Sequence, residues 1–377
     1  MTRFQVLFLA GSMFLELAFM VPPLFAQNLH SPEVHEDRRV TLRLKSFRAT
    51  EVSALLGGQK IALSRNEMGI WEGTSEPLEP QIYDYRFEVD GTEVIDPSNR
   101  WVKKWLTLAS LVEIPGTPPL LTEFTNVPHG SIHRVFYPST SVGKARPVMV
   151  YTPPEYGIDP ARSFPVVVLL HGYGDDETAW TEVGRAHLIA DNLIAAKRIE
   201  PVIIAMPFGH PVPISLSQRP PDYSERNNDL FERDVMGDLL PFLEQRFAVQ
   251  KDVAGRSIVG LSMGGGHAVD IGLRNANTFS SIGAFSAAVP ELDQQTLLTR
   301  YPALSGLEPP ANRLKEFWIP IGEEDFLLGR NEEFHSRLKS IGIRHEFRKT
   351  SGGHEWKVWR EYLPEFLERV AGNSVAK

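Results

Sequence analysis

The spacing of hydrophobic residues divides the chain into two regions. From residue 27 to about 125, apolar and polar positions alternate, as in Val40–Leu44 and Tyr83–Val89. Alternation with a period of two is typical of a strand that buries one face. The second run ends at Asp90-Gly91, which favours a tight hairpin turn, and the pattern continues over Thr92–Ile95. We therefore predict a small β-sandwich in this region.

Beyond this region, short and continuously apolar runs alternate with stretches of helical periodicity. A strand that is apolar throughout is buried on both faces, as in a parallel sheet covered by helices on both sides. We predict an α/β domain over residues 126–377, with the proline-rich residues 106–130 as a linker. The predicted strands are Val148–Thr152, Val166–Leu170, Val202–Ala205, Ser257–Gly260 and Phe317–Ile321, and a helix is predicted over Leu230–Phe247.

The first 26 residues fit neither pattern. Arg3 precedes an apolar run over residues 4–22, and a short apolar segment then ends at Ala26 before the chain becomes polar. This order is typical of a secretory signal peptide with cleavage near Ala26. Glu16 interrupts the run, which argues against a permanent membrane span. We expect a soluble mature protein that is secreted or periplasmic.

Composition excludes several kinds of chemistry. The 377 residues include no cysteine, which excludes thiol nucleophiles, disulfides and thiolate metal sites. The 39 Lys and Arg against 47 Asp and Glu give a net charge of −8, whereas a nucleic-acid partner would need a basic surface. The chain has no His-Glu-x-x-His motif and no phosphate-binding loop. We expect no metal and no cofactor, and the sequence does not indicate an oligomeric state.

The main chemical signal is the pentapeptide Gly260-Leu261-Ser262-Met263-Gly264. It follows a predicted strand and precedes a helical run that starts near His267. In α/β-hydrolases this G-x-S-x-G motif forms a sharp, strained turn that lifts the serine hydroxyl out of the sheet. The start of the following helix favours a developing negative charge. The setting predicts that Ser262 is a nucleophile.

A serine hydroxyl needs a neighbouring base, and in this fold the chain order is serine, acid, histidine. His354 follows a glycine turn and precedes the last amphipathic helix, where the fold presents its base. We therefore predict His354 as the base, with His335 and His345 as alternatives. His267 also follows the serine, but its position in the first turns of a helix indicates a packing or surface role.

The acid should lie in the loop after the strand that precedes the histidine. Phe317–Ile321 is that strand, and Gly322-Glu323-Glu324-Asp325 is the turn that follows it. Asp325 is the favoured acid and Glu324 the alternative. Its expected role is to accept the imidazole Nδ1–H and to stabilise the imidazolium.

An oxyanion hole needs two backbone donors. One is the N–H of Met263, the residue after the nucleophile, and the other should come from the loop after an earlier strand. Val166–Leu170 leads into such a loop, and the Tyr173 N–H is the candidate, with Gly172 as the alternative. His171 is expected to brace this loop.

The first region resembles the immunoglobulin-like domains of glycogen-branching enzymes, and similar domains precede some esterases. The resemblance rests on Gly69-Ile70-Trp71-Glu72, on Pro80–Gly91 and on Asp96-Pro97-Ser98-Asn99. In some relatives this domain binds glucan. We favour a role in packing, or as a wall of the acyl pocket.

The second region resembles the esterase D-like family, which includes feruloyl, acetylxylan and enterochelin esterases and mycolyltransferases. The resemblance covers roughly residues 126–370. The motifs that carry it are His171-Gly172-Tyr173-Gly174 with Trp180, Gly260-Leu261-Ser262-Met263-Gly264-Gly265, Gly322-Glu323-Glu324-Asp325-Phe326-Leu327 and Gly353-His354-Glu355-Trp356.

This second resemblance implies acyl-serine catalysis without metal or organic cofactor. We expect a secreted serine esterase that acts on an acylated polysaccharide or small ester, releasing ferulate or acetate from xylan. The alternatives are a siderophore trilactone esterase, an acyltransferase, and a carbohydrate-binding protein with an idle hydrolase domain.

Overall fold

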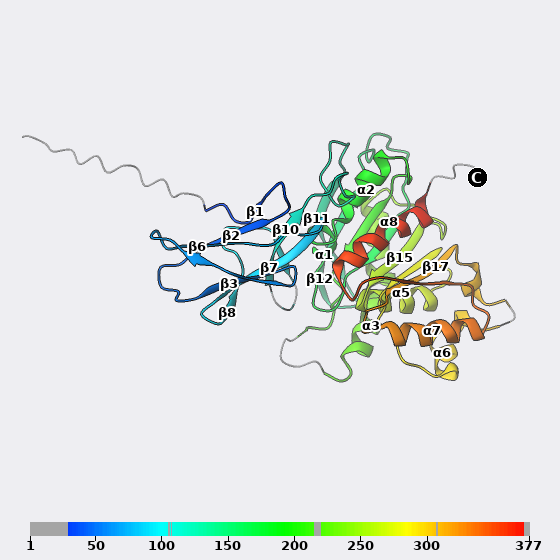
Figure 1. The fold of residues 1–377 in the computed structure, drawn as a ribbon. Helices are drawn as coiled ribbons and strands as arrows, with labels where there is room; N and C mark the ends of the chain where they lie inside the picture. The colour runs from blue at the N-terminus through cyan, green and yellow to red at the C-terminus, as the bar shows by residue number, and fades with distance from the viewer. Residues whose placement is uncertain (1–28, 105, 107, 215–219, 307, 373–377) are drawn as a thin grey trace, which may run out of the picture.

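The computed structural model describes residues 29–104, 106, 108–214, 220–306 and 308–372. A smaller β unit, blue to cyan in Figure 1, lies against a larger unit of mixed sheet and helices. The predicted signal peptide lies outside the described residues. Within those residues, no helix combines the length and the apolar character needed to cross a membrane.

The front unit consists of two antiparallel sheets around a shared core, which confirms the predicted all-β region. Val40 and Leu42 from one sheet pack with Ala54, Phe87 and Ile114 from the other, and all five are fully buried. The first sheet has the order β1 (Glu33–Val34), β2 (Val40–Lys45), β6 (Ile70–Thr74), β5 (Ser64–Arg65). The second has the order β4 (Gln59–Ala62), β3 (Val52–Leu56), β7 (Gln81–Val89), β10 (Leu108–Ile114), β9 (Val102–Lys104), and β8 (Thr92–Val94) pairs with β7.

Strand β10 corrects the predicted linker. Residues 108–114 form a strand that pairs with β7 and β9, so the connection to the second unit starts only after Ile114. Leu111 and Val112 are both buried, one toward each side of the strand. The prolines that indicated a linker begin at Pro115, and the apolar run before them has its partner strand some 25 residues upstream, beyond the reach of a local pattern.

The second unit is built on a mixed eight-stranded sheet. From β14 to β18 all neighbouring strands are parallel, whereas β12 pairs antiparallel with both β11 and β14. The order across the sheet is β11 (Ser131–Ser139), β12 (Lys144–Thr152), β14 (Ile203–Pro207), β13 (Val166–Leu170), β15 (Arg256–Leu261), β16 (Ser281–Phe285), β17 (Glu316–Gly322), β18 (Glu346–Thr350).

Helices cover both faces of this sheet. One face carries α1 (Ala179–Glu182), α2 (Ala186–Ala195) and α8 (Trp356–Ala371). The other carries α3 (Tyr223–Asp234), α4 (Leu240–Arg246), α5 (Met263–Arg274), α6 (Gln294–Arg300) and α7 (Leu328–Ser340). A π-helical turn over Val235–Leu239 joins α3 to α4, so the helix predicted over Leu230–Phe247 starts earlier, at Tyr223. Short 3-10 turns lie at Pro302–Leu304 and Pro310–Arg313.

Strand β13 shows why the apolar runs are continuous. Val166, Val168 and Leu170 enter the core under α3 to α7. Val167 and Leu169 enter the opposite core, under α1, α2 and α8. Because successive side chains of a strand point to opposite faces, burial on both sides requires every position to be apolar.

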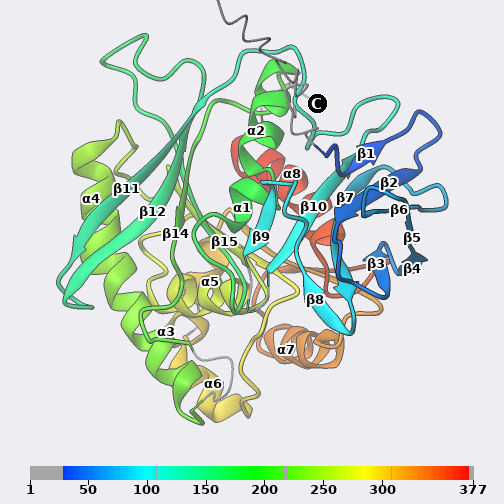
Figure 2. The same ribbon diagram turned by 90° about the vertical axis from the view of Figure 1, so that its left-hand side faces the viewer.

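The front unit extends the second of these cores. Ile82 of β7 and Leu111 of β10 belong to it, and α1 lies against β9 (Figure 2). The buried Arg360 of α8 donates hydrogen bonds to the carbonyl oxygens of Ile82 and Val183, both at 2.9 Å. The Arg185 guanidinium lies 4.0 Å from the ring centre of Trp101 in the front unit. These contacts hold the front unit against the helices beside the sheet.

Candidate active site

Three predicted residues meet at the carboxyl ends of the parallel strands. Ser262 follows β15, Asp325 lies in the turn after β17, and His354 lies between β18 and α8. Ligands of open α/β sheets bind at this edge, because the loops that follow the strands converge there.

Ser262 sits on a strained turn. Its φ of 53° and ψ of −117° are unfavourable for a residue with a side chain. The turn is held because Ser262 N–H donates to Phe285 O at 2.9 Å, and Ser262 O accepts from Gly266 and Ala288. A side chain at Gly260 would meet the Gly264 backbone at 2.5 Å, and one at Gly264 would meet Leu170 O at 2.6 Å. The flanking glycines therefore allow the close packing on which the turn depends.

Helix α5 starts directly after the serine, at Met263, and not near His267 as predicted. The glycines between them resemble a loop because glycine lowers helix propensity. Here they are helical, and a Cβ atom at Gly265 or Gly266 would collide with the chain at Ala287 or Ala288. Tertiary packing therefore outweighs the local preference, and it brings the start of the helix next to the nucleophile.

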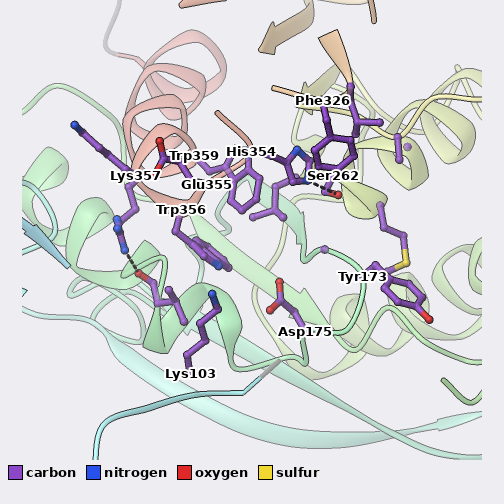
Figure 3. Close-up of a pocket in the computed structure, with 18 of the residues that line it drawn as sticks. Lys103, Tyr173, Asp175, Ser262, Phe326, His354, Glu355, Trp356, Lys357 and Trp359 are labelled. Carbon is purple, nitrogen blue, oxygen red and sulfur yellow. Dashed lines mark hydrogen bonds between the residues drawn. The ribbon is translucent and has the colours of Figure 1, made fainter. Parts of the chain in front are cut away.

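The three side chains form one chain of hydrogen bonds. His354 Nε2 lies 2.9 Å from Ser262 Oγ, and His354 Nδ1 lies 2.9 and 3.0 Å from the two oxygens of Asp325 (Figure 3 shows His354 and Ser262). A neutral imidazole with its proton on Nδ1 satisfies both contacts, since Nδ1–H donates to the carboxylate and Nε2 accepts from the hydroxyl. This arrangement can transfer the hydroxyl proton to the imidazole while the carboxylate balances the new charge.

Asp325 remains a strong acceptor although its side chain is buried. Burial alone would raise its pKa, but hydrogen bonds from His354 and from the Leu327 N–H, at 2.8 Å, outweigh it and lower the pKa below the ordinary value. Glu324, the alternative acid, is exposed.

The other histidines lie outside this chain of hydrogen bonds. His335 of α7 and His345 contact each other, with Nδ1 and Nε2 2.8 Å apart. His267 is buried in α5 beside Phe231 and Asn227.

The loop after β13 faces Ser262 and is braced as expected. His171 is buried, its Nε2 accepts from the Gly209 N–H at 2.8 Å, and its Nδ1 donates to Gly172 O at 2.8 Å. Burial lowers the pKa of His171 to about 4, which keeps it neutral in this role. Tyr173 lines the cleft next to Ser262 (Figure 3). Met263 N–H is the first of α5 and so has no acceptor within the helix. The two oxyanion donors stay predictions.

Both units line the cleft that opens on Ser262. Its volume is about 1380 Å³, and the front unit contributes residues 81–84 of β7 together with Lys103 of β9. Phe326 is 77% exposed, and its ring centre lies 4.5 Å from that of His354. Trp356 adds a second aromatic side chain. The cleft therefore combines a polar centre with apolar walls, as ligand pockets commonly do.

Sequence reasoning gave no role to two residues of this cleft, Asp175 and Lys103. Asp175 lies in the Gly-rich loop after β13 and is 5% exposed, and no hydrogen bond to its Oδ1 is found within the described part of the chain. The one feature of the sequence that could have indicated a role for Asp175 was its position in the loop that is predicted to supply an oxyanion donor. Lys103 had no signal, because only the packing of the two units brings it to the cleft.

The fold and the hydrogen-bonded serine together define an α/β-hydrolase. Residues 139–370, more than half of the chain, match the family model described as putative esterase. The chain belongs to this esterase family, which confirms the expected fold class and the resemblance of the second region.

Named relatives include a feruloyl esterase and an acetyl esterase. The chain is 28% identical over 361 residues to an endo-1,4-beta-xylanase/feruloyl esterase of Xylanibacter ruminicola, an alignment that covers 93% of this chain and 47% of that protein. It is 25% identical over 173 residues to an acetyl esterase of Caldicellulosiruptor saccharolyticus, covering 38% and 65% of the two chains. The chain spans about half to two thirds of the length of the curated relatives it matches.

Solved structures show the same fold. A ferulic acid esterase is 25% identical with a TM-score of 0.56, covering 65% of this chain and 98% of that one. The enterobactin esterase of Shigella flexneri, solved with enterobactin, is 18% identical with a TM-score of 0.63 and covers 92% and 97% of the two chains. The second likeness, which is one of fold alone, extends over both units.

Proposed function

We propose that this esterase is a serine hydrolase that removes feruloyl or acetyl groups from xylan-type polysaccharide through an acyl-serine intermediate. The observation that carries the serine mechanism is the hydrogen-bonded series Ser262, His354, Asp325, with every contact between 2.9 and 3.0 Å.

In the first half of the reaction, His354 Nε2 takes the Ser262 proton while Oγ attacks the ester carbonyl carbon. Asp325 accepts the Nδ1–H throughout and stabilises the imidazolium. The N–H groups of Met263 and Tyr173 are the candidate donors to the oxyanion. When the tetrahedral intermediate collapses, His354 gives its proton to the departing sugar oxygen, and the acyl group remains on Ser262.

In the second half, water takes the place of the alcohol. His354 removes a proton from the water, the hydroxyl attacks the acyl-serine, and the free acid leaves as the proton returns to Ser262. An acyltransferase would differ only in using a sugar hydroxyl in place of this water.

The assignment of the substrate rests on two supports. The relative aligned over 93% of this chain is named as a xylanase and feruloyl esterase. In the cleft, the exposed Phe326 offers an aromatic face of the kind that packs against a cinnamoyl ring or a sugar.

A siderophore trilactone esterase is the second candidate. Its support is that the enterobactin esterase fold matches both units and not only the hydrolase unit. A trilactone is also an ester with aromatic groups, so the same triad and cleft would serve it.

A panel of four substrates separates these candidates: methyl ferulate, acetylated xylan, p-nitrophenyl acetate and a catecholate trilactone. We expect release of ferulate or acetate from the xylan-type esters at the highest kcat/KM, with purified Ser262→Ala protein as the blank. A trilactone turned over with a higher kcat/KM than the other three esters would overturn the xylan assignment while leaving the serine mechanism intact.

We further infer that the protein is secreted or periplasmic, on the basis of the predicted signal in residues 1–26. Expression of the full chain in a bacterial host, followed by N-terminal sequencing of the exported protein, should give a sequence that starts near Gln27. Recovery of the uncleaved chain from the cytosol alone would contradict this inference.

A further inference from the structure

Three consecutive acidic residues in the loop after β13 have very different surroundings. Asp176 Oδ1 accepts hydrogen bonds from the N–H and the hydroxyl of Thr178, at 2.8 and 2.5 Å. Glu177 is paired with Arg134 at 2.8 Å. Asp175 differs from both, because its Oδ1 has no hydrogen-bond partner among the described residues. Of the three carboxyl groups, only that of Asp175 therefore has a buried oxygen that no described residue partners.

Asp175 lies beside the nucleophile. A Cβ atom placed on Gly172 would lie 3.4 Å from Asp175 Oδ2 and 3.6 Å from Ser262 Cβ, so the carboxyl group and the serine border the same space. Asp175 also lines the cleft, as Figure 3 shows together with Ser262 and Lys103. Its side chain is 95% buried within the protein and yet adjoins the volume that a substrate would fill.

An unpaired buried acceptor is costly, and a bound ligand can remove that cost. A buried carboxylate oxygen without a donor loses the hydrogen bonds that water would give it. The charge of Lys103 of the front unit, which is ion-paired with Asp84 at 3.3 Å, lowers the pKa of Asp175 and so partly balances the carboxylate. Its Oδ1 still lacks a hydrogen-bond donor among the described residues.

We propose that Asp175 is a specificity-determining residue, whose Oδ1 accepts a hydrogen bond from a hydroxyl group of the bound ester. This inference rests on the proposed esterase function and adds to it the polar group by which a substrate is selected. The hydroxyl can belong to the alcohol, as a sugar hydroxyl near the ester, or to the acyl group, as a phenol.

The oxygen accepts such a bond in either charge state. Burial raises the pKa of Asp175 to about 7, with Asp176 adding to the rise and Lys103 opposing it. The ionised group offers both oxygens, and the protonated acid still offers its carbonyl oxygen.

Four esters test the proposal and distinguish the two sources of hydroxyl. They are methyl ferulate, methyl 3,4-dimethoxycinnamate, and the 5-O-arabinose esters of the same two acids. Esters of the two acids with the same alcohol differ in the phenolic hydroxyl, so their kcat/KM ratio measures recognition of the phenol. Esters of the same acid with methanol and with arabinose differ in the alcohol, so their ratio measures recognition of the sugar hydroxyls. In the wild type, the ester that carries the recognised hydroxyl should be turned over with the higher kcat/KM.

In Asp175→Ala this preference, the ratio of kcat/KM between the ester that carries the recognised hydroxyl and the ester that lacks it, should fall by about 10- to 100-fold, the usual value of a hydrogen bond to a charged group. Asp175→Asn keeps an acceptor oxygen and should retain part of the preference. Asp159→Asn, which changes an exposed carboxylate in a distant turn, is the matched control. Thermal melts test whether each variant is folded. If Asp175→Ala is not folded, the result for Asp175→Asn decides the test.

Equal losses on all four esters, or no loss on any, would overturn the proposal. A failure of the esterase assignment would be recognised separately, because the wild type itself would then hydrolyse none of the four.

Discussion

Asp325 and Asp175 are two buried carboxylates in loops that follow parallel strands of one sheet, and they behave in opposite ways. Their exposed fractions are 4% and 5%. Hydrogen bonds from His354 and the Leu327 N–H lower the pKa of Asp325 although burial opposes them. Burial raises the pKa of Asp175 to about 7, where Lys103 offsets only part of it.

The comparison shows that hydrogen-bond donors can outweigh the effect of burial on the pKa of a carboxylate near this active site, as they do at Asp325 and not at Asp175. Asp325 has its donors within the protein and is held ionised, as the proposed mechanism requires. Asp175 lacks a donor to one oxygen, so its protonation changes near neutral pH. Asp325 is thus suited to accept the hydrogen bond of His354, and Asp175 to accept one from a ligand.

The largest effect should come from removing the nucleophile Ser262, which is hydrogen-bonded to His354 and through it linked to Asp325. Ser262→Ala should lower kcat by ~10⁶, since only binding and oxyanion stabilisation would remain. His354→Ala should behave similarly. The measurement is ester hydrolysis by protein freed of contaminating esterases, and a variant with a tenth of the wild-type activity would exclude Ser262 as the nucleophile.

Asp325→Asn should have the next largest effect, a loss of about 10⁴ in kcat, because the amide no longer holds the Nδ1–H tautomer or balances the imidazolium. Glu324→Gln changes the neighbouring, exposed carboxylate and is the matched control. It should be nearly as active as the wild type. If the loss appears in Glu324→Gln instead, the acid has been assigned to the wrong residue.

The pH dependence of stability should differ in sign between the two carboxylates. Asp175 ionises near pH 3.8 in the unfolded chain and near 7 in the folded protein, so its contribution to stability is lost as the pH rises between these values. Asp175→Asn should therefore be more stable than the wild type at pH 8, by about 4 kcal/mol at most, with little difference at pH 4. Urea unfolding at several pH values measures this.

Asp325 should show the reverse. Its pKa is lowered on folding, so it stabilises the protein above pH 3.8 and loses this contribution as the pH falls through the folded value. Asp325→Asn should be less stable than the wild type at pH 7, and the two should converge in acid. The same sign of pH dependence in both variants would contradict the contrast between the two loops.

The smallest effect should come from the front unit. Lys103→Met removes the positive charge that acts on Asp175, so the pKa of Asp175 in the folded protein should rise further and the range over which stability falls should extend to higher pH. Lys104→Met, which changes an exposed lysine paired only loosely with Asp176 at 3.9 Å, is the control and should leave this range in place. An unchanged range in Lys103→Met would show that the two units are not coupled through this pair.

Much of this protein was predictable from the sequence because the signals are local. A strand buried on both faces must be apolar at every position, so Val166–Leu170 was predicted with the bounds that the structure has. The turn at Ser262 was predictable for a similar reason, since the glycines that allow its close packing lie next to the serine in the sequence. A histidine after a glycine turn and before the last helix was the natural candidate for the base.

Tertiary structure decided whatever depends on distant partners. Asp325 and Glu324 are neighbours of the same chemical type, and only the position of His354, 29 residues further along, distinguishes them. The sequence of residues 108–114 was interpreted as part of a linker, and only their pairing with β7 shows that they form a strand. Asp175 cannot be told from Asp176 and Glu177 by sequence, because it is distinguished by the donor that it lacks in the folded chain. Lys103 reaches the cleft because the two units pack together, and packing between units leaves no periodic pattern in a sequence.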